Sequence, residues 1–383
     1  MSGTGLISDI RVLEWGANPA LRYAGHLLAG MGAGVERVTV SEAGSDAAAA
    51  CPDDQESLSR FFAFLDSGKS LSNVPLHDLA DRASGADVII YDRDRDGSAP
   101  FARNLPETAV VIAVGAESRA SATAIPRQSD MIVQHRGGVA FNRARPVADP
   151  LVQPPIAGAP FEMSMAAGVG IASACLAGLL ARRKRGGAGP RLDFSLLDYT
   201  AYIGIEALAE WEAGARSFER KRTGRTGVEV AGGSIWVLPC ADGWIMASPR
   251  EEHQWQRWLP VIGSPGWSAD ADLCGDRRKR KINWERIQQL MGEHTAGRTK
   301  AELFAAARTA RVPCFPVSTI EDLFANEQLA ARSFFNRMAT KDGPVSVPGV
   351  PFRMVTPGGN APARGVELKP AIAECATAGG ENG

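Results

Sequence analysis

The most constraining feature of the sequence is a strand–helix–strand pattern at its start. Residues 10–15 (IRVLEW) form a short apolar run typical of a buried strand, and residues 20–31 (ALRYAGHLLAGM) have the periodicity of an amphipathic helix. A second strand is expected at 35–40, and further strands are expected at 87–91 and 109–114. Strands that alternate with helices pair in parallel, so the pattern predicts an α/β fold.

The turn after the first strand argues against a dinucleotide cofactor. It has the sequence EWGANPAL and lacks the GxGxxG spacing that lets a backbone approach a pyrophosphate. The sequence therefore predicts a Rossmann-like large domain without a dinucleotide fingerprint, and neither NAD nor flavin is expected.

Charge and cysteine content argue against a nucleic-acid-binding protein and against a metal site. The 383 residues carry 42 basic and 43 acidic side chains, so no nucleic acid partner is expected. The basic run Arg277–Lys281 is interpreted as a solvated turn or helix start, with an anion site as the alternative. Six scattered cysteines, without a CxxC pair or nearby histidines, predict free thiols and no metal site. No secretion signal and no apolar run of about 18 residues is found, so a cytoplasmic protein is expected.

Changes in composition divide the rest of the chain. A Gly-, Arg- and Ser-rich stretch predicts a linker, and SIWVLPCADGWIMAS after it predicts a hairpin that turns at Asp242–Gly243. Four tryptophans of this region are interpreted as core, with a pocket for an apolar or aromatic acid as the alternative; they are Trp236, Trp244, Trp255 and Trp258. The expected organisation is a large domain over 1–212, a linker over 213–234, a smaller α+β domain over 235–312, a return to the large domain over 313–360 and a flexible tail over 361–383.

Six segments in order, over residues 7 to about 355, carry a resemblance to one family. They are IRVLEWGANPALRYAGHLLAGMGAGVERV, FFAFLDSGKSLSN, DMIVQHRGG, GLLARRKRGGAGPRLDFSLLD, ADGWIMAS and VPCFPVSTIEDLFANEQLAAR. Together they resemble the family III CoA-transferases, the CaiB/BaiF family. The resemblance implies a large domain built from both ends of the chain, a smaller middle domain and an interlocked dimer. It also implies a reaction in which CoA moves from an acyl-CoA to a free carboxylic acid.

The same resemblance shows that one residue is missing. The family's essential group is an aspartate at the start of a long apolar helix, in the pattern D..aG. With Gly168 on the family glycine and Arg182 on the family arginine, Ser164 stands where that aspartate belongs. No aspartate lies between Asp149 and Asp193. A serine would form a stable ester and has no acyl carbon onto which CoA could be loaded, so it cannot replace the aspartate in a transferase cycle.

Three interpretations of this position are open. Ser164 is expected to cap the helix, which we predict to begin there. In the second, Ser164 is a nucleophile with His135 as its base, although His135 is itself expected as a partly buried helix residue. In the third, Glu162 is a substitute nucleophile, displaced by two residues. Family members that epimerise acyl-CoA have a histidine where this chain has Ser129, so a racemase is disfavoured.

Residues for binding CoA are carried over by position. They are Asn18, Arg37, Lys69 and Gln134, each with a structural role as the alternative, and Gly232 and Gly233, which correspond to a glycine loop that covers the site in some members. Two family segments that help to bind CoA are replaced here by IIYDRDRDG and VGAESRAS, and Arg22 takes the place of a proline. These departures weaken the expected site for CoA or acyl-CoA.

Three functions are consistent with these observations. In the first, the chain is a CoA-transferase subunit that acts on an acyl-CoA and a carboxylic acid, with the catalytic aspartate supplied by a paralogous partner chain. In the second, it is a lyase, isomerase or hydrolase that uses the inherited cleft. In the third, it is a non-catalytic homodimer that binds a ligand or partner. Because fold does not fix function, family membership alone does not choose among them.

Overall fold

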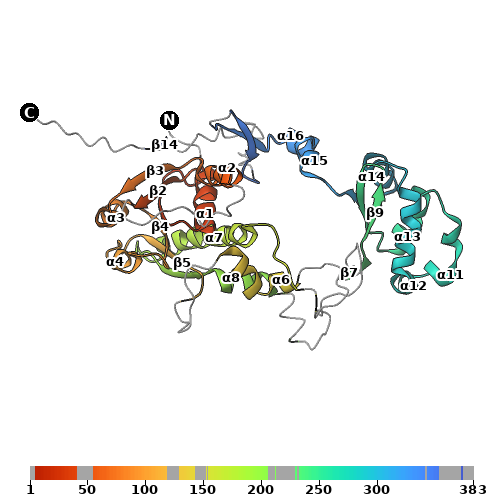
Figure 1. Ribbon diagram of the computed structural model, residues 1–383, viewed down its shortest axis with the longest axis horizontal. Helices are drawn as coiled ribbons and strands as arrows, with labels where there is room; N and C mark the ends of the chain where they lie inside the picture. The colour runs from red at the N-terminus through yellow and green to blue at the C-terminus, as the bar shows by residue number, and fades with distance from the viewer. Residues whose placement is uncertain are drawn as a thin grey trace, which may run out of the picture. The chain divides into compact units, whose positions relative to one another are not determined.

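The chain divides into two compact units in the computed structural model (Figure 1). The structure describes residues 5–40, 55–118, 129–142, 152, 154–205, 212, 229–230, 233–340, 343–352 and 372–373. The first unit comprises residues 1–143, 155–218 and 327–383, and the second comprises 144–154 and 219–326. The large unit is therefore built from both ends of the chain.

A parallel sheet forms the centre of the first unit. Its seven strands have the order β14-β3-β2-β1-β4-β5-β6, and every neighbouring pair is parallel. The strands are β1 (Arg11–Trp15), β2 (Gly34–Val40), β3 (Ser70–Val74), β4 (Val88–Asp92), β5 (Val110–Gly115), β6 (Arg191–Ser195) and β14 (Ile372–Ala373). The order reverses between β1 and β4, which is the switch point where open α/β sheets bind ligands.

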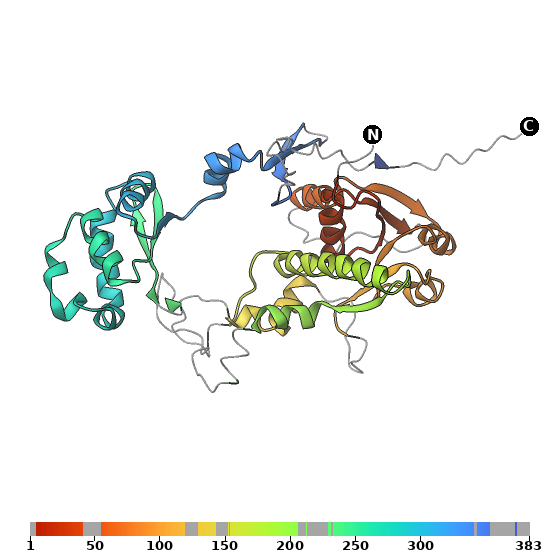
Figure 2. The same cartoon turned by 180° about the vertical axis from the view of Figure 1, so that it is seen from behind.

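Helices cover both faces of this sheet, so its central strands are apolar on both sides. All six residues of β5 are buried, as are four of the five in β4. Figure 2 shows the long helix α7 beside α1, and these two helices pack on one face with Val12, Ile90 and Ile112. The helices of the unit are α1 (Pro19–Gly30), α2 (Gln55–Asp66), α3 (Leu79–Ala83), α4 (Ser98–Arg103), α5 (Asp130–Arg136), α6 (Val139–Asn142), α7 (Glu162–Lys184), α8 (Leu196–Ile203) and α16 (Glu327–Ala331), with the hairpin β12 (Phe335–Met338) and β13 (Val345–Pro348).

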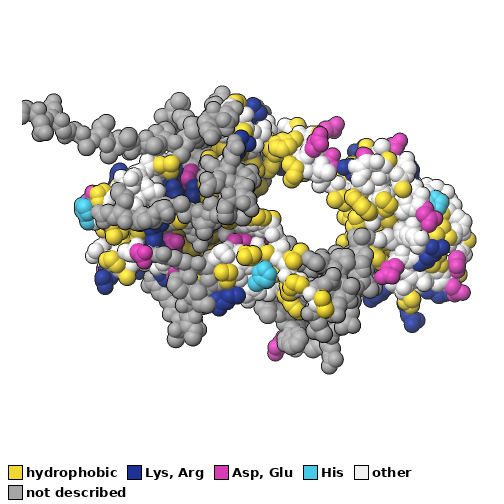
Figure 3. Space-filling model, in the orientation of Figure 1, with side chains coloured by type: hydrophobic (Ala, Val, Ile, Leu, Met, Phe, Trp, Pro, Cys, Tyr) yellow, Lys and Arg dark blue, Asp and Glu magenta, His cyan; other side chains and the backbone are white. Residues whose placement is uncertain are grey.

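The second unit is a small α+β domain. Its antiparallel sheet has the order β11-β10-β9, and its core contains Trp236, Trp255 and Trp258, whereas Trp244 is 48% exposed. Acidic and basic side chains alternate over the visible face of this unit (Figure 3). The elements are β7 (Glu229–Val230), β8 (Gly233–Ser234), β9 (Trp236–Cys240), β10 (Gly243–Ala247), α10 (Glu252–Val261), α11 (Ala271–Cys274), α12 (Arg277–Ile282), α13 (Trp284–Thr295), α14 (Lys300–Ala310), β11 (Cys314–Pro316) and α15 (Ile320–Phe324).

Three expected boundaries differ from the structure. The long helix α7 begins at Glu162, two residues before the predicted start. The hairpin turns at Ala241–Asp242, because Gly243 already pairs with Cys240 as the first residue of β10. The chain returns to the first unit at residue 327 and not at 313, because β11 pairs with β10 inside the second unit.

Other predicted segments have mixed outcomes. The basic run begins helix α12, and its Arg280 is buried over the ring of Trp255 and bonded to Glu252, so this arginine has a structural role. Most of the predicted linker and most of the predicted tail lie outside the described residues. Within the tail, β14 adds a strand to the sheet beside β3.

Helix α7 is also long and apolar enough to cross a membrane, judged by length and hydropathy alone. Its 23 residues pack against α1 and β5, and 44% of the apolar window is buried. Core helices of α/β domains satisfy the same criteria, so this is weak support for a membrane span.

Close contact between α7 and α1 depends on Gly168. A Cβ atom at this position would lie 2.8 Å from the carbonyl oxygen of Ala20 and 2.9 Å from the ring of Tyr23. We expect Gly168→Ala to lower the free energy of unfolding by about 1–3 kcal/mol, because the clash exceeds the gain in helix propensity. Urea unfolding measures this loss. The control is Ser173→Ala on the exposed side of the same helix, and equal stability of both variants would contradict the prediction.

Candidate functional site

The first turn of α7 holds Ser164, which the sequence motifs are predicted to place at the position of the family aspartate. Ser164 is the third residue of the helix and is 6% exposed. Its backbone N–H and its hydroxyl both donate to Oδ1 of Asp130, at 2.6 and 2.7 Å. The predicted capping role is therefore wrong. The residue at the N-cap is Phe161, which makes no side-chain cap bond, and the carboxylate that satisfies this helix end comes from α5.

Helix α5 presents Asp130 and Gln134 to the start of α7. These residues are one turn apart and so lie on the same side of the helix. The Gln134 amide donates to Asp130 Oδ2 at 2.6 Å and to the carbonyl of Ala159 at 3.2 Å, and its oxygen accepts the N–H of Gly158 at 2.7 Å. Gln134, which we assigned to CoA by position, is thus 1% exposed and bonded to the segment before α7.

Sequence reasoning did not select Asp130. The available signal was the spacing of an aspartate and a glutamine four residues apart, directly after Ser129, which caps α5 by accepting the N–H of Ile132. Which helix end this face would meet depends on tertiary contacts. The structure therefore adds a carboxylate to the position where the sequence shows only a hydroxyl.

His135 lies outside this group of hydrogen bonds among the described residues. His135 is exposed, and its Nδ1 lies 2.8 Å from the carbonyl oxygen of Met131 on its own helix. Five residues along a helix turn the side chain by about 140°, so His135 faces away from the side that carries Asp130. Glu162 is the first residue of α7 and is half-buried. Their catalytic roles stay predictions, and Ser164 donates its hydroxyl hydrogen to Asp130.

Phe161 has an unusual backbone at the start of α7. Its φ of 62° and ψ of 13° lie in the left-handed region, which costs a bulky residue about 1–3 kcal/mol. Its ring stacks on Phe61 at 5.0 Å between centroids and meets Phe62 edge-on at 5.9 Å. The segment before α7 is therefore held by polar groups of α5 and by aromatic rings of α2.

A buried ion network occupies the region of two other candidate residues. Lys69 Nζ donates to Glu14 Oε2 at 2.6 Å, and both side chains have no exposed surface. Arg37 lies 3.6 Å from Glu14 and 3.5 Å from Asp66, which in turn binds Arg22 at 2.5 Å. Lys69 also donates to the carbonyl of Arg22 at 2.7 Å. The structure thus places Arg37 and Lys69 inside the protein with carboxylate partners, and their roles toward CoA stay predictions.

Burial shifts the pKa values of Glu14 and Lys69 in the directions that favour their neutral forms. Removal from water raises the pKa of Glu14, which the charge of Lys69 counteracts. Burial likewise lowers the pKa of Lys69, which Glu14 counteracts. Each group of the pair therefore depends on the other for its charge. Among the described residues, three cations and two carboxylates meet in this network.

The remaining candidates have other positions. Asn18 caps α1 by accepting the N–H of Ala20 at 2.9 Å, which is the structural alternative to binding CoA. Gly232 lies outside the described residues, and Gly233 begins β8, which pairs with β7. Both glycine assignments stay predictions.

Salt bridges lie at the carboxyl ends of β4 and β5. Two segments that are expected to differ from the CoA-binding segments of the family begin there. Arg93 pairs with Asp94 and Asp193 and donates to the carbonyl of Glu117, whose carboxylate binds Arg136. These side chains satisfy one another. Among the described residues, no group of three or more His, Cys, Asp or Glu could hold a metal ion.

Comparison with known proteins decides the family. The sequence model of CoA-transferase family III matches residues 115–366, more than half of the chain. The chain belongs to CoA-transferase family III. This confirms the resemblance seen in the sequence motifs.

Relatives and solved structures agree with this assignment. The chain is 26% identical over 370 residues to a succinate–glutarate CoA-transferase of Agrobacterium fabrum, covering 90% of this chain and 88% of the relative. It is 28% identical over 207 residues to the BbsE subunit of a succinyl-CoA:(R)-benzylsuccinate CoA-transferase of Thauera aromatica, covering 50% and 49%. A CaiB/BaiF family protein from Brucella suis has the same fold, with a TM-score of 0.76, 19% identity and 97% of each chain covered.

The bonds to Asp130 predict a stability effect in this family III chain. We expect Asp130→Ala to lower the free energy of unfolding by about 2–3 kcal/mol, because two donors of Ser164 and one of Gln134 lose a charged acceptor. Ser164→Ala removes one of these bonds and is expected to cost about 1 kcal/mol. Chemical denaturation compares both with wild type. An Asp130→Ala variant as stable as wild type would show that α5 does not anchor α7.

His26 predicts a pH dependence of stability. Burial, and secondly the charge of Lys69, lower its pKa from 6.5 to about 4. Between these values the unfolded chain binds a proton that the folded chain does not, so stability falls as pH drops from 6.5 toward 4, by up to about 3 kcal/mol. His26→Gln should flatten this part of the profile. His77→Gln, at an exposed histidine, should leave it unchanged, and an equal effect of both would refute the assignment.

Proposed function

We propose that this chain is a subunit of a family III CoA-transferase that works on an acyl-CoA and a carboxylic acid, and that a paralogous partner chain supplies the catalytic aspartate. The observation that carries the proposal is the first turn of α7. There the side chain at position 164 is a hydroxyl that donates to Asp130, and the helix from Glu162 to Lys184 contains no aspartate.

The chemistry requires a carboxylate that can become an acyl group. Its oxygen attacks the thioester carbonyl, the CoA thiolate leaves and a mixed anhydride forms. The thiolate then attacks the enzyme's own carbonyl carbon, which releases the first acid and leaves CoA on the enzyme as a thioester. The oxygen of Ser164 can accept an acyl group, but a serine offers no carbonyl carbon for the second step.

Several observations support an assembly of two chains. One relative is named as a subunit, BbsE, of a benzylsuccinate CoA-transferase. The first unit also carries large apolar side chains that are 43–67% exposed on adjoining helices, which is typical of a surface covered by a partner. They are Met131, Ile132, Phe141, Val169, Leu180, Tyr202 and Ile203. In the proposal this partner is a family III chain in an interlocked dimer or heteromer, with CoA as substrate. The location is cytoplasmic, supported by the four described cysteines, all unpaired.

A second candidate function rests on Asp130. Its carboxylate accepts two bonds from Ser164 at the start of α7. Such a group can accept a proton from a substrate, as a lyase, isomerase or hydrolase requires. Turnover of an acyl-CoA by the isolated chain, lost in Asp130→Asn, would select this function over the first.

The proposal predicts where CoA becomes covalently bound. The isolated chain, given succinyl-CoA and glutarate, should show no transfer, whereas its complex with an aspartate-bearing paralogue should. After quenching, mass spectrometry should find the CoA thioester on the aspartate of the paralogue, because that aspartate is the catalytic carboxylate in the proposal.

The control is Ser164→Ala in the complex, which should keep the transfer rate. CoA found on Glu162 or on another acid of this chain would overturn the proposal. Transfer by neither form, with intact ligand binding, would favour the non-catalytic alternative.

A further inference from the structure

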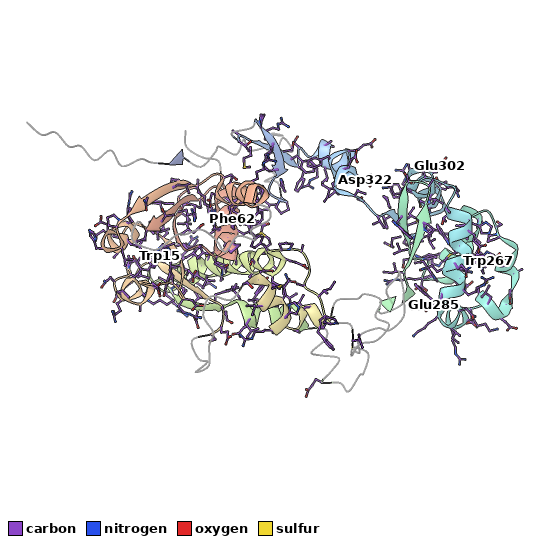
Figure 4. The ribbon with its side chains drawn as sticks, viewed as in Figure 1. Trp15, Phe62, Trp267, Glu285, Glu302 and Asp322 are labelled. Carbon is purple, nitrogen blue, oxygen red and sulfur yellow. The ribbon has the colours of Figure 1, made fainter. Side chains whose placement is uncertain are left out.

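Three aromatic side chains meet beside the first turn of α7. Phe61 and Phe62 lie on α2, and Phe161 precedes α7. The rings of Phe61 and Phe161 are stacked, with 12° between their planes, and Phe62 contacts both. Phe62 lies in the space between α2 and α7 (Figure 4). All three keep part of their surface exposed, so this Phe61–Phe62–Phe161 cluster is not a sealed core.

Phe161 has a backbone conformation that is unusual for its residue type. A left-handed residue before a helix is easily provided by glycine or asparagine, which adopt this conformation at little cost. Phenylalanine adopts it only where the surroundings hold it, and such strained residues occur preferentially at functional sites. The surroundings here are the rings of Phe61 and Phe62.

The cluster adjoins the polar part of the candidate site. Phe161 precedes Ser164 by three residues, which is less than one helical turn and about 4.5 Å along the axis. Its carbonyl accepts the N–H of Met165 at 2.8 Å, so it is fixed to the same turn that Asp130 holds. The turn thus has a polar neighbour on α5 and an apolar neighbour on α2. A carboxylic acid or its thioester likewise has two parts, a polar carbonyl end and a side chain.

We infer that the Phe61–Phe62–Phe161 cluster is the acyl-group subsite and selects acids that carry an aromatic ring. This rests on the proposed function, because it names the substrate class of that site. The stacked pair of Phe61 and Phe161 presents flat apolar surface that another ring can extend by stacking or by edge contact. Arg22 fixes Phe62, since its guanidinium lies 4.2 Å from the ring centroid and donates to the Phe62 carbonyl at 3.3 Å.

Calorimetric titration with three CoA probes tests the subsite. The probes are phenylacetyl-CoA, hexanoyl-CoA and acetyl-CoA, added to wild type, Phe161→Gly, Phe161→Leu, Phe61→Leu and, as control, Phe315→Leu at an exposed phenylalanine of β11. Wild type and the control should bind phenylacetyl-CoA about tenfold more tightly than acetyl-CoA and more tightly than hexanoyl-CoA. The variants in the cluster should reduce this preference to about twofold and leave the affinity for free CoA unchanged.

A probe without CoA separates this inference from the proposed function. Ligand-detected NMR measures binding of free phenylacetate to wild type and to the same variants. If CoA binds without preference for the aryl probe, or if hexanoyl-CoA binds as well as phenylacetyl-CoA, the inference is overturned and the proposed function stands. If no CoA compound binds but phenylacetate does, in a way that requires Phe61 and Phe161, the inference stands and the proposed function falls. Binding of neither ligand overturns both.

Phe161→Gly also serves as a control for failure to fold. Because glycine relieves the backbone strain at this position, it offsets part of the packing that is lost with the ring, so the variant should remain folded. Phe161→Leu keeps an apolar side chain there. A loss of aryl preference in both, with native far-UV circular dichroism, therefore reports on the ring.

Discussion

Glu14 and Lys69 form an ion pair without exposed surface where β1, α1 and α2 meet, and the first unit is arranged around it. A buried pair of this kind is tolerated only when both partners are present and further bonds satisfy them. Arg37 and Asp66 lie 3.6 and 3.9 Å from the pair, and the carbonyl of Arg22 accepts from Lys69, whereas Glu14 Oε1 has no hydrogen-bond partner among the described residues. Arg37 and Lys69, which the family resemblance assigns to CoA, are held inside the protein by this network, and their roles toward CoA stay predictions.

The start of α7 also depends on bonds to buried polar groups. A helix end with buried N–H groups needs an acceptor. In this chain Asp130 on the neighbouring helix is the acceptor, and it also takes the hydrogen of the Ser164 hydroxyl. Ser164 is therefore part of a well-bonded turn. The turn requires an acceptor from α5 and not a carboxylate at position 164.

Apolar patterning predicted much of the fold. The strands β1, β4 and β5 were visible as short, mainly apolar runs, β2 by its three valines, and α1 and α7 because they are long. The strand β3, SLSNV, was missed because only two of its five residues are buried, so it lacks an apolar run. The two residues of β14 are too short for any periodicity, and their pairing with β3 depends on a contact about 300 residues apart.

The sequence by itself determined the family, the α/β class and the serine at position 164, because these follow from the order of residues along the chain. Only the tertiary structure decided that Asp130 meets that serine, that Lys69 pairs with Glu14 and that Phe161 joins Phe61 and Phe62. Each of these pairs is separated by 34 to 100 residues, apart from adjoining rings on α2. Local propensity carries no information over such distances, and the contacts arise from the way α2, α5 and α7 are placed around one sheet.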